Sequence, residues 1–522
     1  MAGGNPSPRS ETPLDLDADH PESMWRQCVD FAVTFSQVPS YHLILEGFLI
    51  SWVVWLLVRR VSNRNKRLRA EKLTKEEEEE LLAEWTPEPL VPEVDPNHPA
   101  LHVPVVDGKP GKHINIDGRD CLNLATHNYL GFAGNEIVEK SAIECIRKFG
   151  VGSCGPRAFY GTADIHVYLE EKLASFLGAE QAVLYSYGFS TIASAIPAYA
   201  KKGDIIFVDE CVNFAIQKGL DASRSKIKYF RHNDVDHLRQ LLEQQANEDK
   251  KHPKQAKVSR RFLIVEGIYM NTGTLCNIEP MLALKRQYKL RLFIDESVSF
   301  GTIGEHGRGI TEYKNISMDD IDLIMATLEY AIGSIGGFCV GTTYVVEHQT
   351  LAGLGYCFSA SLPPMLAAGA FKAIELMEQD LGMFQQLREK AEEMHNGFED
   401  LLGLKLVGER FSPVKHLRLE SSRGNREEDK AVMASIITKA REEGIALVMA
   451  SYLEDAEAHL PPVSIRLTCS TLLSLEDIRR ASKIVHEICD NLFSPLETAK
   501  DGVEQQVDQI QPSESTSQFA EF

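Results

Sequence analysis

The central part of the chain alternates between two patterns of apolar and polar residues. Short, continuously apolar runs are separated by longer amphipathic stretches with a helical period. The runs predicted to be strands are residues 182–188, 204–210, 226–232, 261–269, 290–297, 323–329 and 337–343. Strands that are apolar along their whole length are buried on both faces. This pattern therefore predicts an α/β fold with a mostly parallel central sheet and helices on both sides of it.

The pattern changes near residue 380. Charged amphipathic helices are predicted around residues 375–394, and short strands follow near residues 416–420 and 464–468. A large domain over residues 101–380 and a smaller C-terminal α+β domain over residues 381–497 are therefore predicted. Residues 498–522 lack a sustained apolar period and are expected to be a disordered tail.

The N-terminal part contains one long apolar run. Residues 43–58 include a single acid, Glu46, and eight Lys or Arg residues lie between Arg59 and Lys75, whereas only Arg9 and Arg26 precede the run. This predicts one transmembrane helix over residues 41–60, with a lumenal segment over residues 1–40 and the bulk of the chain in the cytosol. The alternative is a buried amphipathic or re-entrant helix. Residues 61–100 are predicted to form a charged helix and a Pro-rich linker.

Composition excludes several classes of protein. The chain has 522 residues, with 75 acidic and 55 basic side chains and a net charge of −20, which disfavours nucleic-acid binding. The 43% content of hydrophobic residues is ample for large cores. Its ten cysteines form no C-x-x-C pair and no metal-ligand spacing, so a reducing compartment and no metal site are expected.

Separated motifs give the chain a specific resemblance. They are NYLGF (128–132), GVGSCGPRAFYGT (150–162), HND (232–234), EGIYMNTG (266–273), IDES (294–297), SIGGF (334–338), FSASLPP (358–364) and SIRLT (464–468). In this order they resemble the α-oxoamine synthases, which condense an amino acid with an acyl-CoA. The resemblance implies the fold type I of pyridoxal-phosphate (PLP)-dependent transferases, similar to aspartate aminotransferase.

Three cofactor-binding positions of that family have changed. The family lysine that forms a Schiff base with the cofactor follows a T-L-G-K-A type sequence, and the matching residues here are Thr327 to Ala331, with Tyr330 in place of lysine. No lysine lies between Lys314 and Lys372. Two family histidines correspond to Asn213 and Val298. Asp295 remains where the family uses a carboxylate on the pyridine nitrogen, although a carboxylate that satisfies local backbone donors is the favoured reading.

This pattern of losses resembles the non-catalytic long-chain-base subunits of eukaryotic serine palmitoyltransferases. The resemblance implies a heterodimer in which a catalytic subunit carries the lysine and the PLP, and the pair makes 3-ketosphinganine from serine and palmitoyl-CoA. It also implies a small activating membrane subunit, ORM-like regulators and the endoplasmic reticulum membrane. The chain alone is expected to be inactive.

The retained motifs imply that this chain contributes residues to the partner's active site at the subunit interface. Ser359 and Ser361 are candidates to reach the phosphate of the partner's PLP in trans, or they form a hydroxyl-rich turn before a helix. Cys154 and Arg157 are candidates for the interface and the acyl-CoA path, or for a glycine turn with a core cysteine.

Three further residues also have two readings. Arg466 matches a family arginine that binds the carboxylate of the amino-acid substrate. Alternatively, it is retained without this role, since no substrate adduct forms in this chain. Asn128 and Tyr129 line the pocket or pack the start of the body.

Two other functions remain open. An autonomous acyl-CoA transferase with an atypical site would use Asp295 and Arg466. A purely regulatory membrane scaffold would need none of the retained interface residues for turnover.

Overall fold

The computed structural model describes residues 40–70, 74–86, 89–91 and 101–494. The chain divides into two units, residues 1–102 and residues 103–522. The predicted lumenal segment, apart from Ser40, and the predicted C-terminal tail lie outside the described residues, as does the linker over residues 92–100.

The described part of the first unit consists of two helices, α2 (Ser40–Ala70) and α3 (Lys75–Glu84). Helix α3 begins with a capping box, in which the Thr74 hydroxyl accepts from the backbone N–H of Glu77 and the Glu77 carboxylate accepts from the backbone N–H of Thr74. Helix α2 contains the predicted transmembrane residues 41–60. Within the residues that the structure describes, however, none of the helices combines the length and the apolar content needed to cross a membrane.

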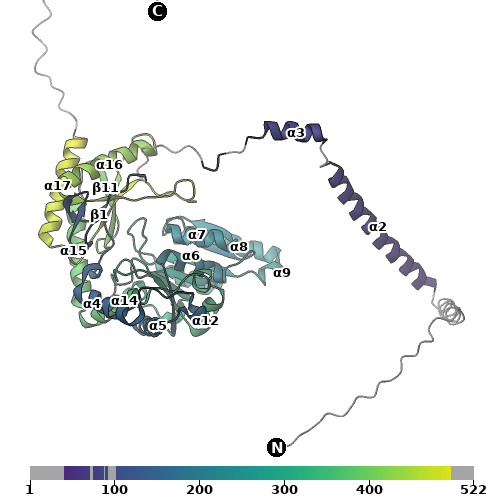
Figure 1. Cartoon of the computed structure of the whole chain (residues 1–522), viewed down its shortest axis with the longest axis horizontal. Helices are drawn as coiled ribbons and strands as arrows, with labels where there is room; N and C mark the ends of the chain where they lie inside the picture. The colour runs from purple at the N-terminus through teal and green to yellow at the C-terminus, as the bar shows by residue number, and fades with distance from the viewer. Residues whose placement is uncertain (1–39, 71–73, 87–88, 92–100, 495–522) are drawn as a thin grey trace, which may run out of the picture. The chain divides into compact units, whose positions relative to one another are not determined.

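The second unit is built around a seven-stranded sheet (Figure 1). In spatial order the strands are β4 (Gln181–Tyr185), β10 (Gly337–Gly341), β9 (Leu323–Thr327), β8 (Arg291–Asp295), β7 (Arg261–Glu266), β5 (Ile205–Asp209) and β6 (Lys226–Phe230). All seven correspond to the predicted runs. Strand β10 is antiparallel to both of its neighbours, and every other pair in the sheet is parallel. The predicted α/β class with a mostly parallel sheet is therefore confirmed.

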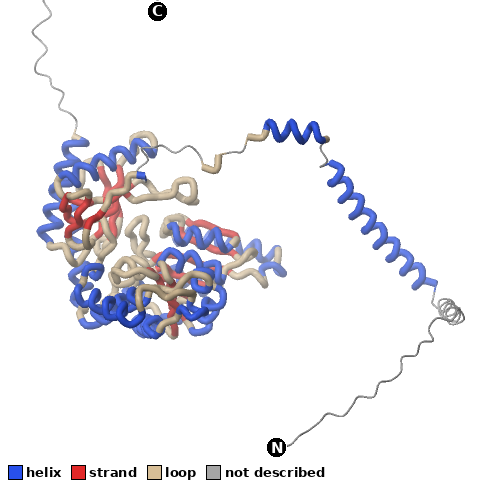
Figure 2. Tube along the Cα trace, in the orientation of Figure 1, coloured by secondary structure: helices blue, strands red, loops and turns tan. Residues whose placement is uncertain are grey.

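Helices separate most of these strands along the chain, and several of the helices pack against the sheet (Figure 2). They are α4 (Glu136–Phe149), α5 (Asp164–Leu177), α6 (Gly188–Tyr199), α7 (Phe214–Ser223), α8 (Val235–Lys251), α9 (Pro253–Ala256), α10 (Ile278–Tyr288), α11 (Ile310–Tyr313), α12 (Thr343–Ala352), α13 (Leu354–Cys357) and α14 (Pro364–Gln379). Strands β5, β9 and β10 are buried at every position, as their apolar runs require.

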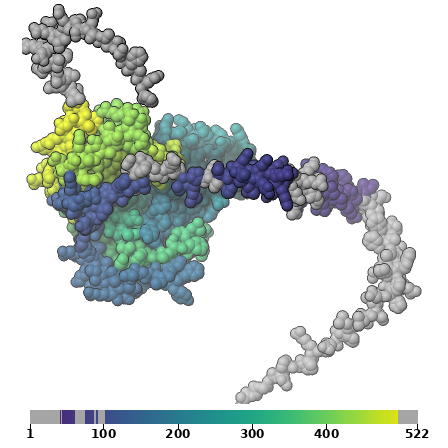
Figure 3. All heavy atoms as spheres, turned by 45° about the horizontal axis from the view of Figure 1, so that its top comes forward, coloured from purple at the N-terminus to yellow at the C-terminus, as the bar shows by residue number. Residues whose placement is uncertain are grey.

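Two smaller sheets complete the unit. The antiparallel sheet has the order β11 (Leu404–Val407), β12 (Val414–Leu419), β15 (Ser464–Thr468) and β14 (Val448–Met449), and it lies with α15 (Gly382–Phe398), α16 (Arg426–Glu442) and α17 (Leu475–Phe493). The other has the order β1 (Val106–Asp107), β2 (His113–Ile116), β3 (Arg119–Asn123) and β13 (Ile445–Ala446). Its early strands thus pair with C-terminal residues, across the boundary expected at residue 380. In Figure 3 the yellow and light-green atoms of the C-terminal segment gather at one end of this unit.

Candidate functional site

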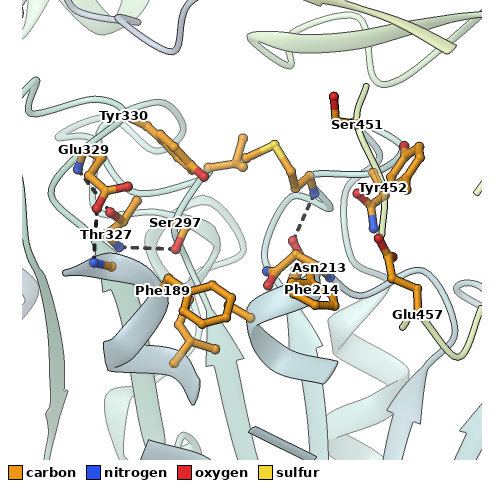
Figure 4. A pocket seen from close by; sticks show the side chains of 17 residues that line it. Phe189, Asn213, Phe214, Ser297, Thr327, Glu329, Tyr330, Ser451, Tyr452 and Glu457 are labelled. Carbon is orange, nitrogen blue, oxygen red and sulfur yellow. Dashed lines mark hydrogen bonds between the residues drawn. The ribbon is translucent and has the colours of Figure 1, made fainter. Parts of the chain in front are cut away.

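A cavity of about 250 Å³ lies where several strands of the large sheet end. Residues that follow β8 and β9 line it on one side, and Ser451, Tyr452 and Glu457 from the C-terminal segment line it on the other (Figure 4). The carboxyl ends of parallel strands meet at one edge of a sheet, which is where α/β proteins place their ligand sites.

The cavity brings together the three positions that the resemblance identified as changed. Tyr330 lies three residues beyond the end of β9, Val298 lies three residues beyond the end of β8, and Asn213 precedes α7. All three line the cavity. None of the three can form a Schiff base, because none carries a primary amine.

Asn213 has two roles in this arrangement. Its side-chain oxygen accepts from the backbone N–H of Ile216 at 3.1 Å and so caps α7, while its Nδ2 donates to Asp295 Oδ2 at 2.7 Å. The other oxygen of Asp295 accepts from the backbone N–H of Ser297 at 2.9 Å. Asp295 is buried beneath Asn213 and does not line the cavity. Its carboxyl group therefore accepts hydrogen bonds from donors within the protein, as expected for a carboxylate at the end of a strand.

The cavity lining contains acidic side chains but no basic ones. Burial raises the pKa of Asp295, and it raises the pKa of Glu266, in the neighbouring strand, still further because the two carboxyls repel. The ionisable acids among the lining residues are Glu266, Glu329 and Glu457, and this lining contains no Lys, Arg or His. An anionic ligand would meet no basic side chain there.

An aromatic cluster covers Tyr330. Its ring lies against His127, with ring centroids 4.4 Å apart at an interplanar angle of 34°, and 6.1 Å from the ring of Tyr129. The Tyr129 hydroxyl and His127 Nδ1 are hydrogen-bonded at 2.7 Å. Burial raises the pKa of Tyr330 and lowers that of His127, so both rings stay neutral at physiological pH. Sequence reasoning missed His127, although it directly precedes the NYLGF motif.

Two other predicted residues lie close to this cluster but have structural partners. Arg466 donates from Nη2 to the carbonyl oxygen of Ala125 at 2.9 Å, and its Nε is buried with no hydrogen-bond partner in the described residues. Asn128 is buried, donates to Pro110 O at 3.1 Å and accepts from Ala133 N. Asn128 thus packs the start of the folded unit.

The loop over residues 150–162 is held by an internal ion pair. Arg157 donates from both terminal nitrogens to Glu170, at 2.8 Å each, and from Nε to the Thr162 hydroxyl at 3.0 Å. The guanidinium of Arg157 is thus hydrogen-bonded to residues of this chain. Cys154, in contrast, is exposed and has a φ of 60°. The interface roles of both residues remain predictions.

The two candidate serines differ in their surroundings. The Ser361 hydroxyl donates to the carbonyl oxygen of Gly161, and the Ser361 backbone N–H donates to Gly155 O at 3.0 Å, so this segment lies against the loop over residues 150–162. Ser359 is half-buried. Their role toward a partner's phosphate remains a prediction.

The HND motif supports the sheet. Side chains of Asp209, Cys211 and His232 come within 4.8 Å of one another, but the two ring nitrogens of His232 are already engaged by Asp209 and Thr274. Burial raises the pKa of the Cys211 thiol to about 12, which disfavours the thiolate that a metal requires. Asp234 caps α8 by accepting from His237 N at 2.8 Å. We therefore interpret the cluster as structural.

Comparison with known proteins identifies the family. The family model for aminotransferase class I and II matches residues 119–485. The chain belongs to this aminotransferase family. Its relatives include "Serine palmitoyltransferase 1" of Dictyostelium discoideum, which is 41% identical over 87% of this chain and 95% of the relative. "Long chain base biosynthesis protein 1" of Arabidopsis thaliana is 38% identical over 87% of this chain and 92% of the relative.

Two solved structures share the fold of this chain. A serine palmitoyltransferase from Sphingomonas wittichii matches with a TM-score of 0.66 and 25% identity, covering 75% of this chain and 93% of that chain. An 8-amino-7-oxononanoate synthase from Francisella tularensis matches with a TM-score of 0.56 and 20% identity, over 72% and 99% of the two chains. The predicted resemblance to the long-chain-base subunits of serine palmitoyltransferases, within the aminotransferase class I and II family, is confirmed.

The cavity does not fit the PLP that this fold implies. Tyr330 cannot form the covalent link, the Asn213 amide covers the carboxyl group of Asp295, and the lining residues supply no positive charge for a phosphate group. The family fold is therefore present without a cofactor site of the usual chemistry in this chain.

Proposed function

We propose that this chain is the non-catalytic subunit of a serine palmitoyltransferase. The assembled enzyme would condense L-serine with palmitoyl-CoA to give 3-ketosphinganine, CO₂ and CoA, in the first step of sphingolipid biosynthesis. The names of the relatives support the reaction. The observation that carries the non-catalytic role is that Tyr330 lines the cavity at the position where the family has its lysine.

In this proposal the PLP belongs to a lysine-bearing partner of the same fold, and this chain completes the partner's site. An exposed apolar surface supports a partner. Val151, Phe159 and Tyr160 are exposed on the loop over residues 150–162, and Leu354 and Phe358 are exposed on the adjoining segment. Hydrogen bonds from Ser153 and Ser361 hold the two segments together. Exposed apolar clusters of this kind mark interaction surfaces.

We also propose that the chain acts at the endoplasmic reticulum membrane, with its folded unit on the cytosolic side. Support comes from α2, where the apolar side chains of residues 44, 45, 48–50 and 52–58 are all exposed. Arg59 and Arg60 follow them directly, as expected on the cytosolic side of a membrane-associated helix. A small activating membrane subunit and ORM-like regulators would meet the chain there.

Reconstitution tests this function. The chain, its catalytic partner and the complex of the two are purified separately, and CoA release from palmitoyl-CoA is measured with and without L-serine. We expect serine-dependent CoA release from the complex and none from this chain alone, because the residues that line its cavity include no lysine whose amine could activate serine. Serine-dependent turnover by the isolated chain would contradict the proposal and favour an autonomous transferase.

A further inference from the structure

Helix α6 starts at the edge of the cavity and is capped from a distant segment. Its N-cap residue, Tyr187, makes no side-chain capping hydrogen bond. Instead, Glu329 Oε1 accepts from the backbone N–H of Gly188, the first residue of the helix, at 3.1 Å (Figure 4). A carboxylate brought from 141 residues away thus takes the place of a local cap.

The segment that carries Glu329 is fixed in position. The backbone N–H of Glu329 donates to the Thr327 hydroxyl at 3.1 Å, and the backbone N–H of Thr327 donates to the Ser297 hydroxyl at 3.2 Å. A Cβ added to Gly188 would lie 2.3 Å from Thr327 Oγ1 and 3.3 Å from Glu329 Oε1. Glycine at this position therefore permits the close approach of Glu329 to the helix.

The start of a helix attracts anions, because its first N–H groups are unpaired and the helix dipole is positive there. A phosphate group and a carboxylate compete for the same donors. In this chain a tethered carboxylate already accepts from Gly188, and the residues that line the cavity include no basic side chain that could hold a phosphate group. Glu329 stands where the family motif T-L-G-K-A has glycine, directly before the lost lysine.

We propose that Glu329 is a built-in anion that occupies the start of α6 and closes this cavity to pyridoxal phosphate independently of the missing lysine. This inference rests on the proposed function, in which the partner carries the cofactor. It goes beyond that function because it predicts that the substitution Tyr330→Lys alone does not restore binding of pyridoxal phosphate to this chain. Glu329 is a positioning residue for α6 and a competitor of the phosphate group.

The test uses the complex of the full chain with its catalytic partner and compares three variants: Tyr330→Lys, Tyr330→Lys with Glu329→Gly, and Tyr330→Lys with Glu329→Gln. Each complex is incubated with pyridoxal phosphate and reduced with borohydride, and pyridoxyl-lysine at position 330 is quantified by mass spectrometry. We expect at least tenfold more labelling in the Glu329→Gly double variant than in Tyr330→Lys alone. The Glu329→Gln control keeps the size and removes the charge, so it should also label more than Tyr330→Lys alone.

Equal labelling of the three variants, or none in any of them, would overturn the inference. An independent measurement uses the single variant Glu329→Ala and its melting temperature. Inorganic phosphate should raise this temperature more than chloride at equal ionic strength, and it should leave the wild-type complex unchanged. An equal response of both proteins would also overturn the inference. Cofactor on the wild-type chain would instead refute the proposed function itself, so the two failures are distinguishable.

Discussion

Replacing Arg157 with methionine is expected to lower the free energy of unfolding of the folded unit by about 3–5 kcal/mol. The Arg157 side chain is 6% exposed and that of Glu170 is 16% exposed, so the substitution leaves a nearly buried carboxylate without its cation. Glu170 also accepts from the backbone N–H of Leu184 in β4, at 2.9 Å. The ion pair therefore ties the loop over residues 150–162 to the end strand of the central sheet.

Chemical denaturation followed by circular dichroism measures this loss. The matched control is the double variant Arg157→Met, Glu170→Gln, which removes both charges, keeps an acceptor oxygen for the backbone N–H of Leu184, and should recover a large part of the stability. The loop also carries the exposed residues Cys154 and Phe159, so the single variant should also assemble poorly with the partner. A loss below about 1 kcal/mol, the range of exposed ion pairs, would show that the pair does not hold the loop.

Acidification is expected to destabilise the folded unit through His416. Burial lowers the pKa of His416 from 6.5 to about 3, while its ring nitrogens bond the Ser464 hydroxyl and the carbonyl oxygen of Met270, each at 2.9 Å. Between pH 6.5 and 3 the unfolded chain binds a proton at this residue and the folded chain does not. Stability contributed by neutral His416 is therefore present above pH 6.5 and is lost as the pH falls through this window, by about 5 kcal/mol in all.

The measurement is the free energy of unfolding at several pH values for the wild type and for His416→Gln. Glutamine can still donate to Met270 O but does not titrate. The difference between the two proteins isolates His416 from other histidines, such as His127 and His166, whose pKa values desolvation also lowers. The wild type should lose more stability than the variant below pH 6.5. Parallel pH profiles would contradict the assignment.

The large sheet was predictable because each of its strands carries its own signal. An apolar run of the right length, such as the one that forms β5, reports burial on both faces wherever it lies in the chain. The sheet of β1, β2, β3 and β13 was not predictable. Leu122 pairs with Ile445, and the local pattern of apolar and polar residues in either segment does not indicate which distant strand it will pair with.

The candidate site was predictable where a motif position had changed chemistry. Tyr330, Asn213 and Val298 were identified one by one, and the fold brings them to one cavity. The contacts of His127 with Tyr330 and of Glu329 with Gly188 could not be foreseen, because each joins segments far apart in the sequence. The pairing of Arg157 with Glu170 joins the loop over residues 150–162 to the helix that follows it, and no motif in either segment indicated this pairing.

The most direct test of the account is to locate the cofactor in the assembled enzyme. The wild-type complex is reduced with borohydride, digested, and searched for pyridoxyl-lysine peptides by mass spectrometry. We predict a stoichiometric adduct on the catalytic partner and none on any lysine of this chain. A stoichiometric pyridoxyl adduct on this chain would contradict the account.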